Sequence, residues 1–102
     1  PDGLVGVDGL IEAKCPFNPV NHATTVLTDE VPKKYQYQVQ GNLWVTDRKW
    51  CDFISYSQDF PEASQLHVIR VERDEAMIEK LVARLEEAEE LKQLLIQKLT
   101  NG

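Results

Sequence analysis

The sequence predicts a mixed α+β fold that begins with strands and ends with a long helix. An Asp-Gly turn signal lies between two apolar runs near the N-terminus. Strand-forming residues dominate positions 50–56 and 65–71, and leucines recur at helical spacing toward the C-terminus. We therefore expect an N-terminal β-hairpin, a helix, two further strands and a long C-terminal helix. All of them would share the modest core of one domain, residues 1–102.

The composition restricts the kinds of partner that we expect. The chain has a formal net charge of -6, so it lacks the overall positive charge of proteins that bind nucleic acid non-specifically, and any DNA contact must be local. Most of the acidic excess lies in residues 72–90. No apolar run approaches the roughly 20 residues that span a bilayer, and no signal segment is present. These features predict a cytoplasmic protein without membrane contact.

Residues 3–15 are predicted to form the hairpin. A three-residue loop, Val7 to Gly9 with Gly9 at positive φ, pairs Asp2 with Lys14. This register places three charged side chains on one face and leaves an apolar face to pack on the core. The charged face carries Asp2, Glu12 and Lys14, and the expected core face carries Gly3, Val5, Val7, Ile11, Ala13 and Cys15. A two-residue loop would mix charged and apolar side chains and is disfavoured.

The remaining elements follow from breakers and periodicity. We expect residues 16–31 to be mostly loop with one helical turn over 23–27, and Pro32 to begin a helix that continues over 33–46. Asp74 should cap a helix that runs to about Leu99 and ends at Asn101-Gly102. Its apolar stripe predicts a core or partner-helix contact and comprises Met77, Leu81, Leu85, Ala88, Leu91, Leu95 and Leu99.

The two cysteines and two histidines suggest no metal site. Cys15 and Cys51 form no close pair, so we expect buried, reduced thiols. His22 and His67 lack the spacing of metal ligands and are expected at the surface or in loops.

The charged face of the hairpin is the candidate reactive site. Two carboxylates and a carbonyl suit Mg²⁺, which binds one or two protein carboxylates together with water and phosphate oxygens. Asp2 and Glu12 would supply the carboxylates and Ala13 the carbonyl, while Lys14 would hold or help deprotonate an attacking water. From spacing alone, a solvent-facing set of mutually compensating ion pairs is the favoured interpretation, since such surface pairs are common.

Two motifs resemble those of a known nuclease family. The segments Pro1-Asp2-Gly3 and Glu12-Ala13-Lys14 resemble the PD-(D/E)xK nuclease signature. The helix segment from Tyr35 to Gln40, followed by Trp44-Val45-Thr46, resembles the corresponding motif of the lambda exonuclease branch, the phage-type recombination nucleases. The first motif is short and widespread, whereas its combination with the second is fairly specific. The resemblance covers nearly the whole chain.

The resemblance implies a three-layer, restriction-endonuclease-like core that lacks its upstream part, including an acidic residue of the metal site. It implies that Asp2 and Glu12 hold Mg²⁺ or Mn²⁺, that Lys14 is the catalytic lysine, and that Gln38 lies beside the active site. Tyr35 shares a helix face with Gln38, so both side chains could reach the substrate or Lys14. A packed phenol and a satisfied buried amide are the alternative for these two residues.

The implied activity is digestion of linear duplex DNA from 5′ ends during phage-type recombination. A homotrimer and a single-strand annealing partner are implied with it. Lys33 and Lys34, in the first turn of their helix, would contact DNA phosphate or remain a solvated pair. Two other functions stay open: an endonuclease of restriction or repair type, and a non-catalytic interaction module that uses the acidic C-terminal helix.

Overall fold

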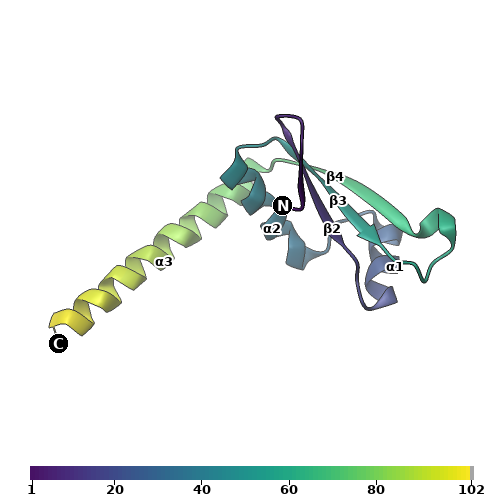
Figure 1. The fold of residues 1–102 in the computed structure, drawn as a ribbon. Coiled ribbons are helices and arrows are strands. Elements are labelled where there is room, and N and C mark those ends of the chain that lie inside the picture. The colour runs from purple at the N-terminus through teal and green to yellow at the C-terminus, as the bar shows by residue number, and fades with distance from the viewer. Residues whose placement is uncertain (102) are drawn as a thin grey trace.

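A four-stranded mixed sheet, covered on one face by two helices, carries a third helix that projects away from it (Figure 1). The computed structural model describes residues 1–101. Its elements in chain order are β1 (Gly3–Val5), β2 (Gly9–Lys14), α1 (Pro19–Thr28), α2 (Lys33–Thr46), β3 (Trp50–Tyr56), the short 3₁₀ helix η1 (Glu62–Ser64), β4 (Leu66–Glu72) and α3 (Glu75–Asn101). The predicted α+β class is confirmed.

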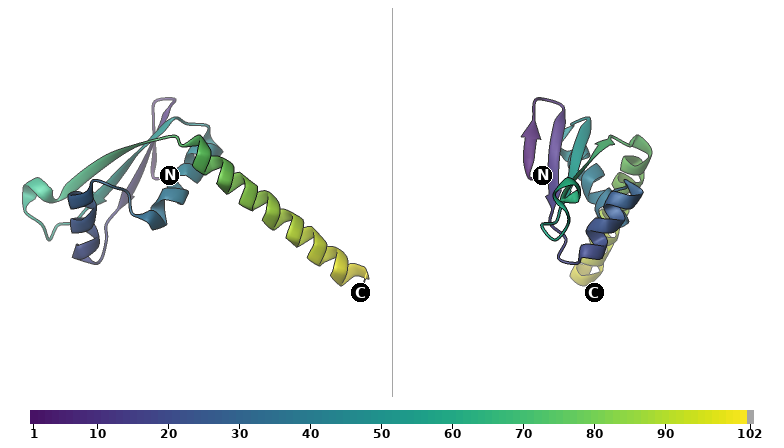
Figure 2. Two further views of the ribbon diagram at one scale, coloured as in Figure 1. Left: turned by 180° about the vertical axis from the view of Figure 1, so that it is seen from behind. Right: turned by 90° about the vertical axis from the view of Figure 1, so that its right-hand side faces the viewer.

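The sheet has the strand order β1-β2-β3-β4. The parallel strands β2 and β3 are joined by a crossover through α1 and α2, and the two outer pairs are antiparallel. In the right-hand view of Figure 2, both crossover helices lie on the same side of the sheet. Residues 1–101 therefore form two layers, and the third layer of the expected restriction-endonuclease-like core is not formed by these residues.

The hairpin register differs by two residues from the prediction. Val5 pairs with Gly9 and Leu4 with Leu10, so the three-residue loop is 6–8 and Gly6, not Gly9, takes the positive φ of 56°. Gly9 is a strand residue packed under Trp50, whose ring atoms would lie 2.2 Å from a Cβ at that position. Gly9, the glycine of the Asp-Gly pair, thus allows close packing against Trp50 and does not form the turn. A shift of two residues preserves the side-chain alternation, so the predicted grouping on faces is unchanged.

The core lies on the face opposite to the one expected. Leu10 and Glu12 are buried, whereas Ala13, Cys15 and Val5 on the other face are exposed. The prediction of an apolar core face on the hairpin, and of a buried Cys15, was therefore wrong. The reason is tertiary: α1 and α2 cross on the side of Leu10, so the charged face of the hairpin is partly covered and the apolar face is not.

The core itself is small and forms between the sheet and α2. Its buried members are Leu10, Val31, Val39, Leu43, Cys51 and Phe53, with Tyr35, Ile69 and Val71 packed against them. The helix predicted over 33–46 and the strand predicted over 50–56 are confirmed, and the second strand lies one residue later than expected.

The segment expected to be mostly loop contains a ten-residue helix, α1. The Asn18 side chain accepts a hydrogen bond from the Val20 amide at 3.0 Å, and Pro19 occupies the first helical turn. Asn18 and Pro19 are thus helix start signals, whereas the sequence interpretation took the stretch from Pro16 to Pro19 as turn formers. His22 of this helix is fully buried, contrary to expectation. Its ring nitrogens bond with the Ser55 hydroxyl and the Ser64 carbonyl, each at 2.7 Å.

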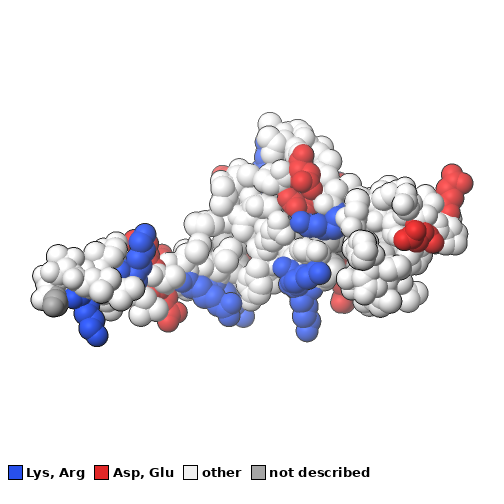
Figure 3. All heavy atoms as spheres, turned by 60° about the horizontal axis from the view of Figure 1, so that its bottom comes forward, with Lys and Arg blue, Asp and Glu red and all other residues white. Residues whose placement is uncertain are grey.

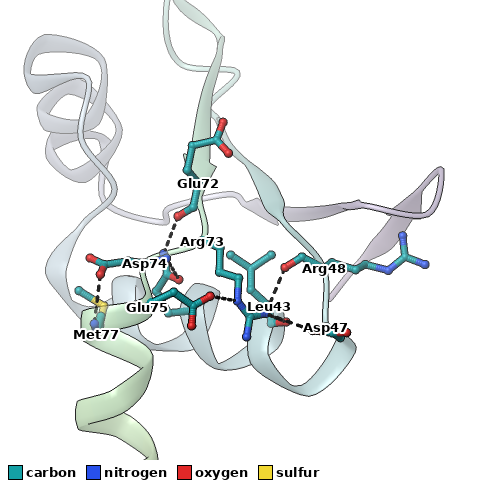
Figure 4. Close-up of polar contacts among 9 residues, drawn as sticks. Leu43, Asp47, Arg48, Glu72, Arg73, Asp74, Glu75 and Met77 are labelled. Atoms are coloured by element: carbon teal, nitrogen blue, oxygen red, sulfur yellow. Dashed lines mark hydrogen bonds and ion pairs between the residues drawn. The ribbon is translucent and has the colours of Figure 1, made fainter.

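The start of α3 is fixed to the end of α2 (Figure 4). The Arg73 guanidinium donates to the carbonyls of Leu43 and Arg48 at 2.8 and 3.3 Å, and it pairs with Glu75. Asp74 caps the helix as predicted, since its carboxylate accepts from the Met77 amide at 3.1 Å. These contacts set the direction in which α3 leaves the body of the molecule.

Most of α3 is exposed to solvent. Of the residues described in it, only Ile78 is buried, and the predicted stripe contacts the body only near its start. The leucines at 85, 91, 95 and 99 are 49–74% exposed. The helix was expected to end at Asn101-Gly102. It extends to Asn101, and Gly102 lies outside the described residues. None of the helices in residues 1–101 combines the length and the apolar character needed to cross a membrane.

Candidate active site

The three charged side chains of the hairpin gather where β1 and β2 meet. The Ala13 amide donates a hydrogen bond to the Asp2 Oδ2 atom at 2.7 Å, and the Asp2 amide donates to the Ile11 carbonyl at 2.9 Å. Asp2 directly precedes β1, and its two bonding partners, Ile11 and Ala13, are the residues on either side of Glu12 in β2. Lys14 Nζ lies 3.8 Å from Glu12 Oε2. Asp2 is therefore held next to the segment of β2 that carries Glu12 and Lys14.

Glu12 is a buried carboxylate with several polar neighbours. Only 4% of the residue is exposed. Its Oε1 atom lies 3.3 Å from the Asn42 amide nitrogen, while Lys14 approaches the other oxygen. A carboxylate removed from water is costly unless cations and hydrogen-bond donors compensate it. Lys14 supplies this positive charge, and Asn42 supplies a hydrogen-bond donor.

Lys14 also contacts α2. Its Nζ atom lies 4.9 Å from the centroid of the Tyr35 ring, and Lys34 Nζ lies 5.0 Å from the same ring. The ring packs in turn against Phe53, with a centroid separation of 5.7 Å. Because the ring face attracts cations, Tyr35 helps to fix the position of the Lys14 ammonium.

The other residues singled out in the sequence line the same region less closely. Gln38 is exposed, and it lies on α2 between Tyr35 and Asn42 at spacings of three and four, so it shares their face. Lys33 and Lys34 are exposed in the first turn of α2. The structure therefore gathers Asp2, Glu12, Lys14 and Tyr35, and it places Gln38 on the adjoining helix face.

Asn42 is a residue of this site that the sequence interpretation missed. It reaches Glu12 from α2 across a separation of 30 residues. A signal was present, because Asn42 stands four positions after Gln38 and seven after Tyr35, on the same helical stripe. Recognising it required knowing that α2 crosses over the charged face of the hairpin.

The electrostatic effect of Glu12 extends to the strand beside it. Burial, followed by the negative charges of Glu12 and Asp52, raises the pKa of the Cys51 thiol to about 11. Cys51 is thus a neutral core residue at physiological pH. On the surface turned forward in Figure 3, basic side chains lie in small groups, several of them next to acidic side chains, and no continuous basic surface is seen.

The donor set fits a hard divalent cation with only two protein carboxylates. Within residues 1–101, no group of three or more Asp, Glu, His or Cys side chains is arranged to hold a metal ion. Asp2 uses one oxygen for the Ala13 amide, and a carboxylate can accept at both oxygens, so its second oxygen remains able to bind a cation. Two carboxylates completed by water and substrate oxygens match the preference of Mg²⁺.

The chain is similar to known proteins in sequence and in fold. Residues 1–49 match the family described as the YqaJ-like viral recombinase domain. The chain is also similar to the crystal structure of an alkaline exonuclease, LHK-Exo, from Laribacter hongkongensis. The identity is 40%, the TM-score is 0.82, and the match covers 99% of this chain and 54% of that one. For LHK-Exo in complex with dAMP, the identity is 40%, the TM-score is 0.83, and the match covers 99% of this chain and 53% of that one.

The chain thus spans about half the length of the exonuclease that it matches. No curated protein matches it. The predicted resemblance is confirmed: the chain is similar in sequence and fold to an alkaline exonuclease, and residues 1–49 match the YqaJ-like viral recombinase domain.

Proposed function

We propose that this chain is the C-terminal part of the catalytic core of a metal-dependent DNA exonuclease. The observation that carries the proposal is the gathering of Asp2, Glu12 and Lys14 at one end of the hairpin, beneath α2. The similarity over 99% of the chain to an alkaline exonuclease supports the same activity. The alternative of simple surface ion pairs is disfavoured because Glu12 is buried.

Asp2 and Glu12 would hold Mg²⁺ or Mn²⁺ through their carboxylates, and Ala13 through its backbone carbonyl. When bound, the cation would lower the pKa of a water and offset the negative charge that develops on the phosphate. The Ala13 amide orients the Asp2 carboxylate, and Asn42 orients that of Glu12. Both carboxylates are therefore held by hydrogen bonds before a cation arrives, which lowers the cost of binding it.

Lys14 would act on the reacting groups directly. Its ammonium donates hydrogen bonds to the attacking water or to an oxygen of the scissile phosphate, where negative charge grows during hydrolysis. Glu12 and the Tyr35 ring hold this ammonium from two sides. Gln38, on the same face of α2, would contact the water or the phosphate.

The substrate would be duplex DNA with a free end. Tyr35, Lys33 and Lys34 would contact the strand that enters the site, the lysines through phosphates. LHK-Exo has been crystallised with dAMP, which suits a nucleotide ligand for the present site as well. The resemblance further suggests 5′-to-3′ digestion in phage-type recombination, a homotrimer around the DNA, and a single-strand annealing partner in the cytoplasm of a bacterium or phage-infected cell.

A nuclease assay on the full-length protein tests the proposal. With Mg²⁺ and linear duplex DNA, Lys14→Ala and Glu12→Gln should each reduce the rate of digestion by about 100-fold or more, as removal of a group that stabilises transition-state charge does elsewhere. The Lys49–Asp8 pair has the same 3.8 Å separation on the exposed loop end of the hairpin, so Lys49→Ala and Asp8→Asn are matched controls that should digest at the wild-type rate. Wild-type digestion by Lys14→Ala and Glu12→Gln would refute the proposal.

Covalently closed circular duplex separates the exonuclease from its endonuclease rival. An enzyme that requires a free end should leave this substrate intact while it digests the linear form. Cutting of closed circles at a comparable rate, with the same dependence on Lys14, would assign the site to an endonuclease.

A further inference from the structure

The strand β4 forms one border of the sheet, and within residues 1–101 no strand pairs with its outer side (Figure 1). Free N–H and C=O groups along such a border can pair with another chain, and proteins commonly prevent this with a very short strand, a lysine, a proline or a bulge. β4 has seven residues, pairs with β3 without a bulge, and contains neither lysine nor proline. Its single arginine, Arg70, donates to Asp52 at 3.0 Å. The border is therefore able to receive a further strand.

The hydrogen bonds to β3 decide which backbone groups of β4 face outward. At one end of the pair, the Ser57 amide donates to the Gln65 carbonyl at 2.9 Å. At the other end, the Arg73 amide donates to the Lys49 carbonyl at 2.9 Å. Because bonded and non-bonded pairs alternate in an antiparallel ladder, the odd-numbered residues of β4 bond with β3 and the even-numbered residues point their N–H and C=O groups away from it. The first three even-numbered residues are Leu66, Val68 and Arg70.

The end of β4 agrees with this direction and limits the free stretch. The carbonyl of Glu72, the next even-numbered residue, accepts a hydrogen bond from Gln40 Nε2 at 3.0 Å. The Asp74 amide donates to Gln40 Oε1 at 2.8 Å. Gln40 thus occupies the border beyond Arg70, and residues 66–70 remain accessible to a strand of about five residues, since paired strands have nearly the same rise per residue.

A groove of about 380 Å³ lies beside this border, between α2, β4 and the start of α3. Its apolar lining comes from Val39, Ile69, Val71 and Met77. Side chains of a strand alternate between the two faces of a sheet, so a strand added to β4 would direct every second side chain toward the side on which the groove lies. In recognition by strand addition, backbone hydrogen bonds provide affinity and such pockets provide selectivity.

The charged residues that line the groove are all acidic. They are Glu30, Glu72 and Asp74, each of them exposed, and no lysine or arginine lines it. Like charges brought together disfavour association, whereas opposite charges favour it. A second copy of this chain would bring the same acidic groove with its own β4, so the charges favour a basic partner instead.

We propose that residues 66–70 and the adjoining groove bind an extended segment of another protein, in which branched apolar residues lie between basic ones. The segment adds a strand to β4, places an apolar side chain against Ile69 and Val71, and directs its basic side chains toward Glu30 and Glu72. This interaction goes beyond the proposed nuclease function and does not depend on it.

Amide hydrogen exchange of the full-length protein, followed by ¹⁵N–¹H NMR, tests the proposal with a blocked pentapeptide of three valines between two lysines. The amides of residues 66, 68 and 70 should exchange rapidly in the free protein. They should slow about fivefold when about four fifths of the protein is bound, because only the free fraction exchanges. The amides of residues 67, 69 and 71 are an internal control, since they bond with β3 and should be slow in both states.

Altered peptides and variants separate the two parts of the recognition. A peptide whose valine nitrogens are methylated cannot donate backbone hydrogen bonds, and one with glutamates in place of lysines has the wrong charge, so each should bind about tenfold more weakly or worse. Glu30→Gln should weaken binding of the lysine peptide about two- to fivefold. Glu86→Gln, which removes an equally exposed carboxylate on α3, is the matched control and should bind as the wild type does.

Several results would overturn the proposal. These are no binding at millimolar peptide, equal binding of the methylated peptide, or equal slowing of odd- and even-numbered amides. Slow exchange of the even-numbered amides in the free protein would show that β4 already pairs with another part of the protein or, if it depends on protein concentration, with a second copy. No step uses metal or DNA, so these results are independent of the nuclease assay.

Discussion

Asn42 shows how a residue outside the motif can organise the carboxylates. Its amide donates to Glu12 at 3.3 Å, and Glu12 is buried, so loss of this donor leaves a buried oxygen with one partner fewer. We predict that Asn42→Ala weakens Mn²⁺ binding or lowers the rate of digestion by about 10- to 100-fold, as removal of partners of metal ligands does elsewhere.

Calorimetric titration with Mn²⁺, together with the nuclease assay, measures this effect. Thr46→Ala is the control, since the Thr46 hydroxyl lies one turn along α2 and bonds only to the Asn42 carbonyl. Equal effects of the two substitutions would show that Asn42 acts merely through helix stability.

The two cysteines should differ sharply in reactivity. Burial and the charge of Glu12 raise the pKa of Cys51 to about 11, while Cys15 is exposed. At pH 8.5, iodoacetamide should modify Cys15 and leave Cys51 intact in the native protein, as mass spectrometry can measure. Modification of Cys51 at the same rate would contradict the structure.

The same shift predicts how stability depends on pH. The pKa of Cys51 in the folded protein is raised from 9.0 to about 11. The neutral thiol therefore makes its full contribution to the free energy of unfolding below pH 9, and this contribution is lost as the pH rises toward 11. The free energy of unfolding, measured in urea, should therefore fall faster with pH in the wild type than in Cys51→Ala. The difference in slope should be at most about 1.4 kcal/mol per pH unit.

At the scale of single residues, the grouping of the site was predictable and its burial was not. Alternation along β2 is fixed by the sequence, so Glu12 and Lys14 share a face whatever the loop. Which face is covered depends on where α1 and α2 cross. That information lies in contacts such as Asn42 with Glu12, far apart along the chain.

Among the elements, the hairpin depends on close packing at Gly9. A Cβ there would lie 2.2 Å from atoms of the Trp50 ring, whereas a Cβ at Gly3 meets its nearest atom at 3.9 Å. We predict that Gly9→Ala destabilises the protein by about 1–3 kcal/mol, the usual cost of overpacking, and that Gly3→Ala has little effect. Thermal denaturation of the two variants compares them, and equal stability would contradict the packing of Trp50 on Gly9.

Helix α1 illustrates a competition between local signals. Asn18 and Pro19 are as frequent in turns as at helix starts, and the segment has few strong helix formers. Tertiary contacts decide the outcome, because His22 is buried against β3 and bonds with Ser55. A partner 33 residues away could not be identified from the segment alone.

For the whole molecule, the projecting helix dominates the shape. The radius of gyration is 17.7 Å, compared with about 13 Å for a compact domain of 100 residues. The body of the fold is the sheet with α1, α2 and the first turns of α3, as both views of Figure 2 show. The length of α3 was predictable from its periodicity, whereas its projection follows from the junction at Arg73.

The distal half of α3 should be dispensable for folding of the body. We predict that truncation after Ala88 changes the Tm by no more than about 2 °C, because the removed part of α3, 89–101, is exposed throughout. Truncation after Asp74, which removes the buried Ile78, should instead lower it strongly. A large fall on the shorter truncation would mean that the exposed leucines are packed against a partner in solution.

We propose that Asp2, Glu12 and the Ala13 carbonyl bind one divalent cation. Paramagnetic broadening by substoichiometric Mn²⁺ in ¹⁵N–¹H NMR spectra tests it most directly, without requiring activity. We predict that the amide signals of residues 2, 3 and 11–14 broaden first, and that Glu12→Gln abolishes this effect. Broadening centred on the acidic residues 86–90 of α3, and unchanged by Glu12→Gln, would show that the cation does not bind at Asp2 and Glu12.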